Sequence, residues 1–322
     1  MLPISSLRFL LAAWVALGHL GFPVLQSPEE GRVLWLARAL LNNAINAQAA
    51  VIVFFVISGF CIHFPNRGGR AVHSWTRYYA RRYIRILIPM AAALGLALLV
   101  GMSRASLSNS VLWSLFCEEI YYFIYPALLR ARNRFGWSRV SAAAWVLALA
   151  VVLTNPRAGN YPSYGHALNW ILGLPCWLLG CQLAERFDRF HERPVSAARL
   201  WMWRGGAWFL SAAFSVIRFH TPIGFPWTLS LFAIYAALWL EQEMRVYLGR
   251  RPPVLEAPGE ASYSLYLTHV QSIWFLYKLP IAAAMSAGAL WLSSIVAFGS
   301  VAAIFYRLVE RPSHRLARRV LS

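Results

Sequence analysis

Ten long apolar runs constrain the fold of this chain more than any other feature. A helix needs roughly 20 mostly apolar residues to cross a bilayer. The runs lie at about 3–25, 44–64, 84–102, 109–129, 138–155, 167–184, 200–217, 225–241, 260–279 and 284–307. Charged residues make up only 13% of the 322 positions, whereas a soluble domain usually carries about a quarter. The sequence therefore predicts an all-α integral membrane protein, a bundle of about ten transmembrane helices.

The positive charges between the runs predict its orientation. Of the 30 lysine and arginine residues, 22 fall in the even-numbered connections and the C-terminal segment, and 6 fall in the odd-numbered connections. Cytoplasmic connections carry the excess of these residues, so both termini are expected in the cytoplasm. The first run lacks a preceding basic segment and a clear small-residue cleavage site, so we expect an uncleaved span rather than a signal peptide.

The net charge of +18 does not indicate a nucleic-acid-binding protein. Nearly all the arginines lie in short gaps between apolar runs, and no basic stretch interleaved with aromatic residues remains. Since no connection exceeds about twenty residues, we expect one transmembrane domain over residues 1–322. The four cysteines lie within apolar runs without metal-ligand spacing, which predicts buried thiols and no metal site.

Arg8 and His19 both lie in the first apolar run. Eleven positions apart, they fall about 20° apart around a helix and about 16 Å apart along it. A guanidinium and an imidazole are costly at membrane depth unless they have a function. Two interpretations remain open: a snorkelling arginine with a histidine hydrogen-bonded inside the bundle, or a site with a permanent cation and a proton acceptor on one helix face.

The second connection is rich in arginine. Its members are Arg67, Arg70, Arg77, Arg81, Arg82 and Arg85. Arg82 and Arg85 are three positions apart, and so adjacent on a helical face that leads into the third run. Paired guanidiniums match the oxygens of phosphate, but anchoring to anionic lipid explains such a cluster equally well.

The fourth run contains two adjacent carboxylates, Glu118 and Glu119. They point about 100° apart on a helix, so both cannot face one partner. We expect one to face the interior, with Arg8 as an available counter-ion. A polar stripe at helical spacing accompanies them: Ser114, Glu118, Tyr121, Tyr122 and Tyr125. A buried Glu–Arg pair that holds helices together and a direct catalytic role are equally open.

The ninth run contains a second intramembrane imidazole, His269, at the end of the stretch Tyr-Ser-Leu-Tyr-Leu-Thr-His. With Tyr266 and Thr268 nearby, the simplest interpretation is a histidine hydrogen-bonded between helices. The remaining histidines lie at the edges of connections and carry little signal, for example His63, His73 and His191.

Together these stretches resemble the acyltransferase-3 family of bacterial integral-membrane acyltransferases. The segments that carry the resemblance are Leu7-Arg8 with His19, Phe-Phe-Val-Ile-Ser-Gly-Phe at 54–60, Arg-Arg-Tyr-Ile-Arg at 81–85, Trp-Ser-Leu-x-x-Glu at 113–118, Tyr-Ser-Leu-Tyr-Leu-x-His at 263–269 and Val-Glu-Arg-Pro at 309–312. Their order and spacing cover nearly the whole chain.

The resemblance implies a multi-pass protein of the bacterial inner membrane. It implies an acyl-coenzyme A donor, usually acetyl-CoA, no permanently bound cofactor, and an acceptor hydroxyl on a glycan or a lipid-linked saccharide. It also implies catalytic importance for Arg8 and His19 and donor binding by Arg82 and Arg85. In length the chain is similar to the stand-alone members, which lack a fused SGNH hydrolase-like domain.

We expect neutral His19 to act as general base on the acceptor hydroxyl, or to carry the acyl group transiently. Glu118 would orient His19 or balance Arg8. Candidate supporting residues are Ser58, Trp113, Ser114, Tyr122, Tyr266 and His269. The rival hypothesis is a transporter or exporter of a polar solute or glycan precursor, with the intramembrane polar groups along its path. The inverted repeats typical of many transporters are not evident.

Overall fold

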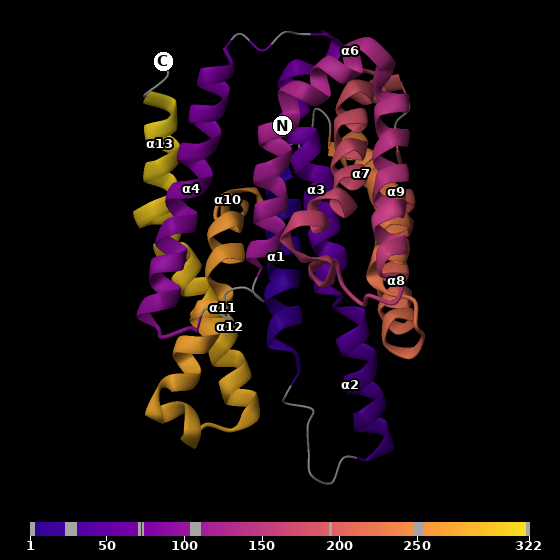
Figure 1. Ribbon diagram of the computed structural model, residues 1–322. Coiled ribbons are helices and arrows are strands. Elements are labelled where there is room, and N and C mark those ends of the chain that lie inside the picture. Colours follow the sequence, from indigo (N-terminus) through magenta and orange to yellow (C-terminus); the bar gives the residue numbers. More distant parts are fainter. Residues whose placement is uncertain are drawn as a thin grey trace. The chain divides into compact units, whose positions relative to one another are not determined.

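The computed structural model describes residues 4–22, 31–69, 72, 74–103, 111–192, 195–247 and 254–319, and their regular secondary structure is entirely helical (Figure 1). The helices are α1 (Ile4–Leu20), α2 (Arg32–Ala44), α3 (Ala47–His63), α4 (Trp75–Leu99), α6 (Leu112–Thr154), α7 (Gly165–Arg186), α8 (Ala197–His220), α9 (Phe225–Tyr247), α10 (Glu256–Gly259), α11 (Ser262–Lys278), α12 (Ala287–Phe305) and α13 (Arg311–Arg319). The prediction of an all-α fold is confirmed.

Each predicted run coincides with a helix. The fourth and fifth runs are the two halves of α6, which bends at Gly136, where φ is 79°. Glycine has no Cβ, so it adopts this positive φ without strain. Among the described residues, five segments are long and apolar enough to cross a membrane: Arg32–Gly68, Trp75–Leu99, Leu112–Thr154, Tyr161–Phe190 and Ala287–Arg319. The chain is an all-α membrane protein, and the placement of its termini stays a prediction.

The first connection was expected to be a loop, yet residues 32–44 form α2. Val33, Leu36 and Leu40 lie on one side of this helix, and Arg38 lies on the other, as in an amphipathic helix. Its apolar side chains are exposed, with Val33 79% and Leu40 70% accessible. Such a pattern is typical of a helix at a membrane surface. With 13 residues, α2 by itself is shorter than a bilayer-spanning helix.

The chain forms two compact units. The first unit comprises residues 1–4, 48–73 and 113–254, and holds most of α3 together with α6, α7, α8 and α9. The second unit comprises residues 5–47, 74–112 and 255–322, and holds most of α1 together with α2, α4 and α10 to α13. A single domain over the whole chain therefore stays a prediction.

In the first unit, α3 and α7 are in backbone contact. A Cβ atom at Gly59 would lie 1.9 Å from the carbonyl oxygen of Trp177, and one at Gly180 would lie 1.9 Å from that of Val56. Small residues let membrane helices approach this closely. Trp177 itself is fully buried and packs on Tyr121 at a ring-centroid distance of 5.7 Å.

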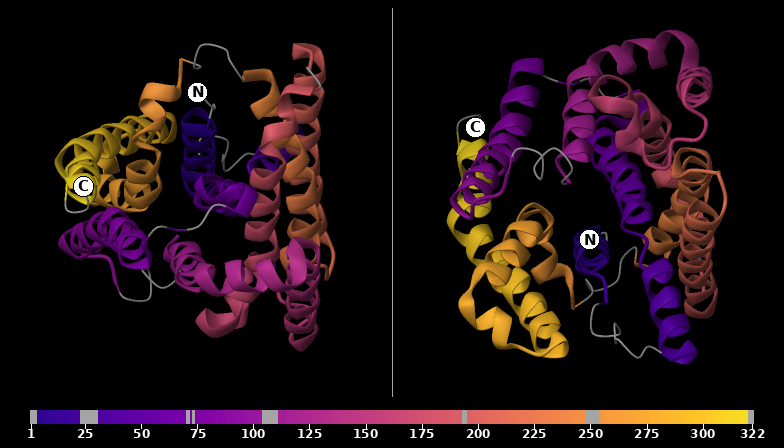
Figure 2. Two further views of the ribbon diagram at one scale, coloured as in Figure 1. Left: turned by 90° about the horizontal axis from the view of Figure 1, so that it is seen from above. Right: turned by 60° about the horizontal axis from the view of Figure 1, so that its bottom comes forward.

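In the second unit, α11 and α12 run side by side, and α4 packs against α11 and α13 (Figure 2). Leu7, Leu11 and Val15 of α1 recur every four residues and are buried. Glu256 accepts hydrogen bonds from the backbone N–H of Ser5 at 3.3 Å and of Ser6 at 3.0 Å. A carboxylate at the N-terminus of a helix satisfies its unpaired N–H groups and opposes its positive dipole end, so it fixes the start of α1.

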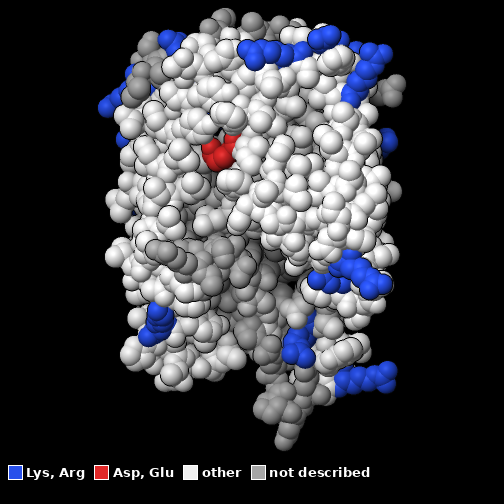
Figure 3. Space-filling view, viewed as in Figure 1, with Lys and Arg blue, Asp and Glu red and all other residues white. Residues whose placement is uncertain are grey.

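Charged side chains are sparse along the helices. Figure 3 shows a face on which the visible lysine and arginine side chains lie toward the helix ends, while uncharged side chains cover most of the surface between them. The exposed apolar residues include Leu98, Phe123, Val146, Phe209, Leu231 and Val296. Apolar side chains exposed along long helices are the surface that a protein presents to lipid.

Candidate active site

Two histidines of the second unit lie in contact. His19 comes from α1 and His269 from α11, and their ring centroids are 5.1 Å apart. The Nε2 atom of His269 lies 3.3 Å from the Nδ1 atom of His19. His269 is fully buried, whereas His19 is exposed. The structure thus joins the first and last imidazoles that the sequence placed at membrane depth.

The backbone of α1 determines which nitrogen of His19 is basic. Its Nδ1 lies 2.9 Å from the carbonyl oxygen of Val15, one turn earlier. A carbonyl oxygen only accepts, so in the neutral ring Nδ1 carries the hydrogen and donates it. Nε2 then keeps its lone pair. An exposed imidazole with this nitrogen unprotonated has the form that a general base requires.

Glu310 is a buried carboxylate, and the positive charges of Arg8 and Arg85 are close enough to contribute to its electrostatic environment. Glu310 is 2% exposed and accepts hydrogen bonds from Ser264, from the backbone N–H at 3.0 Å and from the hydroxyl at 2.5 Å. Its other oxygen lies 3.7 Å from Nε2 of His314. We call these four residues, Arg8, Arg85, Glu310 and His314, the Glu310 cluster. The cluster contains two guanidiniums, and guanidiniums bind the oxygens of anions such as phosphate and carboxylate.

Glu310 is the last residue of a π-helical turn, Tyr306–Glu310, between α12 and α13. Such turns are rare and occur frequently at functional sites. Glu310 belongs to the Val-Glu-Arg-Pro stretch at 309–312, but it was not among the predicted site residues, because its contact with Ser264 of α11 depends on the fold. Arg82, three residues before Arg85 in α4, lies 6.0 Å from the centroid of the Tyr78 ring.

A hydrogen-bonded chain joins three of the predicted residues in the first unit. Trp177 Nε1 donates to Ser58 Oγ at 3.2 Å, Ser58 Oγ lies 2.9 Å from the Tyr122 hydroxyl, and Tyr122 donates to Glu118 at 3.2 Å. This series of hydrogen bonds therefore ends at the Glu118 carboxylate. A pairing of Glu118 with Arg8 or His19 would join the two units and stays a prediction.

The other supporting candidates make packing contacts. Trp113 is buried and stacks on Tyr161 at a centroid distance of 5.9 Å. Ser114 is buried, and the hydroxyl of Tyr266 donates to the carbonyl oxygen of Val111 at 3.5 Å. The Tyr266 ring lies beside His269, with ring centroids 6.2 Å apart. The place of these three residues in the site stays a prediction.

Comparison with known proteins decides the family. The sequence model of the acyltransferase-3 family, described as an acyltransferase domain, matches residues 4–307. The chain belongs to the acyltransferase-3 family. It is also 27% identical over 334 aligned positions to "Acyltransferase MdmB" from Streptomyces mycarofaciens, with 87% of this chain and 84% of that protein covered. No solved structure matches the chain. These findings make it a membrane acyltransferase and favour acyl transfer over transport.

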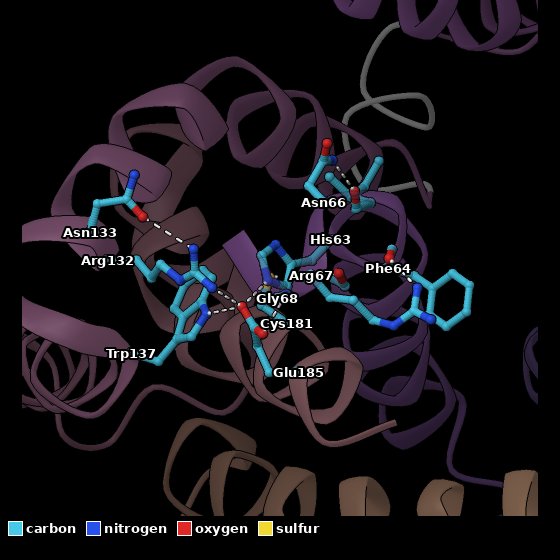
Figure 4. A network of polar contacts seen from close by, with 12 residues as sticks. His63, Phe64, Asn66, Arg67, Gly68, Arg132, Asn133, Trp137, Cys181 and Glu185 are labelled. Carbon is cyan, nitrogen blue, oxygen red and sulfur yellow. Dashed lines mark hydrogen bonds and ion pairs between the residues drawn. The ribbon is translucent and has the colours of Figure 1, made fainter. Parts of the chain in front are cut away.

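Sequence reasoning missed a second polar network of the acyltransferase, shown in Figure 4. His63, at the end of α3, is fully buried between the Tyr125 hydroxyl at 2.8 Å and the Glu185 carboxylate at 2.8 Å. The same carboxylate accepts from Arg132, from Trp137 Nε1 at 3.1 Å and from the backbone N–H of Gly68 at 2.9 Å. We call this set the Glu185 network. The signal was present as an acidic residue at the end of a largely apolar run.

Arg67 makes its contacts in the same region of the acyltransferase. It donates to Asp188 at 2.9 Å and to the carbonyl oxygen of Phe64 at 2.9 Å, and its guanidinium lies 4.1 Å from the centroid of the Phe64 ring. It therefore holds the turn after α3 in place, and this contact accounts for one member of the arginine-rich connection without a phosphate. Arg70 and His73 lie outside the described residues.

Proposed function

We propose that this acyltransferase moves an acyl group, normally acetyl, from cytoplasmic acyl-CoA to a hydroxyl of a cell-surface or lipid-linked glycan in the bacterial inner membrane. His19 is the general base. The observation that carries this proposal is the exposed His19 imidazole, held at Nδ1 so that Nε2 keeps its lone pair. The family supplies the reaction class, and the residues supply the roles.

The reaction requires one proton to travel from the acceptor to the leaving thiolate. His19 Nε2 takes the hydroxyl proton while the hydroxyl oxygen bonds to the thioester carbonyl carbon. The carbon–sulfur bond then breaks, the oxygen retains the acyl group as an ester, and the coenzyme A thiolate leaves. The thiolate receives the proton from His19, which returns to its neutral form. No other reactant is needed.

The Glu310 cluster supports binding of the donor. Phosphate groups carry the negative charge of coenzyme A, and guanidiniums bind phosphate oxygens with a fork of donors. The charges of Arg85 on α4 and of Arg8 on α1 both contribute to the electrostatic environment of Glu310, and Arg82 lies three residues from Arg85 on α4. Arg8 and His19 are about 16 Å apart along the helix. The extended pantetheine arm of coenzyme A would span this distance, from the phosphates near Arg8 to the thioester near His19.

The leading test replaces His19 by alanine. Membranes that contain His19→Ala receive radiolabelled acetyl-CoA and the native acceptor, and alkali-labile label on the acceptor is measured. Loss of a general base typically costs about 10²- to 10⁴-fold in rate. Undiminished transfer at normal protein level would rule out His19 as the base. The acceptor is identified by comparing the O-acetyl content of surface glycans from a deletion strain and its parent.

A further inference from the structure

His269 is the buried neighbour of the proposed base. We infer that His269 is a positioning residue, whose Nε2 accepts a hydrogen bond from Nδ1–H of His19 and so holds the His19 ring in the tautomer and orientation in which Nε2 is basic. The inference rests on the proposed function, because it gives His269 a part in that reaction and in no other. His269 itself, fully buried, does not meet the substrate.

The backbone of α11 determines the tautomer of His269. Its Nδ1 lies 2.9 Å from the carbonyl oxygen of Tyr266 and 3.2 Å from that of Leu265. Both partners only accept, so Nδ1 of the neutral ring carries the hydrogen. Nε2 is left as an acceptor. This is the atom that faces His19.

His19 is restrained in the complementary way. Its Nδ1 has two acceptors, the carbonyl oxygen of Val15 on its own helix and Nε2 of His269 on another. A rotation of the ring by half a turn would break both hydrogen bonds. One acceptor on the same helix and one on a neighbouring helix therefore keep the proton on Nδ1 and restrain the orientation of the ring. The outer hydrogen-bond partners of metal-ligating histidines act in the same way.

The neighbours of His269 on α11 have partners within that helix. Thr268 donates to the carbonyl oxygen of Ser264 at 2.8 Å, and Ser272 donates to that of Thr268 at 2.7 Å. Both are buried. Their hydroxyls are satisfied locally, whereas Nε2 of His269 meets a side chain of α1. A buried side chain of similar size would fill the space equally well, so the acceptor nitrogen is the property that matters to His19.

Two amide variants distinguish the effect of the acceptor nitrogen of His269 from the effect of its side-chain volume. In His269→Asn the amide reaches the α11 carbonyls but not His19, because it ends near the position of Nδ1. In His269→Gln the longer amide places an acceptor near the position of Nε2. We expect kcat of His269→Asn to fall about 10- to 100-fold, by analogy with the loss of an outer hydrogen-bond partner of a metal-ligating histidine. The donor KM should stay unchanged, and His269→Gln should recover most of the rate.

A double variant and a packing control complete the experiment. Because His269 acts through His19, His19→Ala with His269→Asn should be no slower than His19→Ala alone. Ser272→Ala, a buried change one turn along α11, should keep the wild-type rate per folded protein. Additive losses in the double variant, equal rates of the Asn and Gln variants, or a wild-type rate of His269→Asn would overturn the inference. Full transfer by His19→Ala would instead overturn the proposed function.

Discussion

At the scale of single residues, local pattern identified the polar groups but not their partners. Arg8, His19 and His269 stand out in the sequence because each interrupts an apolar run. Glu310 and His63 were not predicted as site residues, because the burial of a residue near the end of an apolar run depends on the fold. Helical spacing relates residues on one helix. Contacts such as that of His19 with His269, 250 positions apart, depend on packing.

The arginine pair gives a prediction at this scale. Arg82→Ala and Arg85→Ala should each raise the donor KM, with a smaller effect on kcat, because phosphate binding contributes equally to the ground state and the transition state. Loss of one charge-assisted contact corresponds to about a tenfold rise or more. Initial rates at graded acetyl-CoA concentrations measure it.

Arg77→Ala is the matched control, because Arg77 is exposed two turns before Arg85 on α4. If lipid anchoring alone explains the arginines, all three variants lower the amount of protein in the membrane and none changes the donor KM.

At the scale of elements, the apolar runs predicted the positions of the long helices well, since bilayer thickness sets their length. α2 was missed because it is a 13-residue helix with two arginines, shorter than the roughly 20 apolar residues that a bilayer span requires. The π-helical turn at Tyr306–Glu310 could not be predicted from the sequence either, because it depends on how α12 and α13 pack against their neighbours.

The Glu185 network gives the prediction at this scale. Glu185→Gln removes the negative charge of a carboxylate that contacts four neighbours. These neighbours are His63, Arg132, Trp137 and the backbone N–H of Gly68. We expect the free energy of unfolding to fall by about 1–3 kcal/mol, because buried donors lose a charged partner. Thermal unfolding of the purified protein in detergent measures this change, and the donor KM of the remaining folded enzyme should not change.

Asp188→Asn serves as the comparison, because Asp188 pairs with Arg67 but its side chain is 67% exposed. Exposed pairs contribute roughly 0–1 kcal/mol. A larger effect of Asp188→Asn than of Glu185→Gln would contradict the assigned importance of the buried network.

At the scale of the whole molecule, arginine placement predicts the orientation in the membrane. The described part of the C-terminal segment carries Arg311, Arg315, Arg318 and Arg319 in α13. The positive-inside rule therefore predicts that this helix is cytoplasmic. A green fluorescent protein fused after residue 319 should therefore fluoresce, and alkaline phosphatase fused there should be inactive. Phosphatase inserted at residue 31, before α2, should be active, and the opposite pattern would invert the predicted topology.

The backbone contact of α3 with α7 has a mechanical consequence. Gly59 and Gly180 leave no room for a side chain between these helices. A sliding or rolling motion of one helix against the other would drive Cα atoms into carbonyl oxygens. We therefore expect the two helices to move together during the catalytic cycle, with any opening and closing taken up elsewhere in the chain.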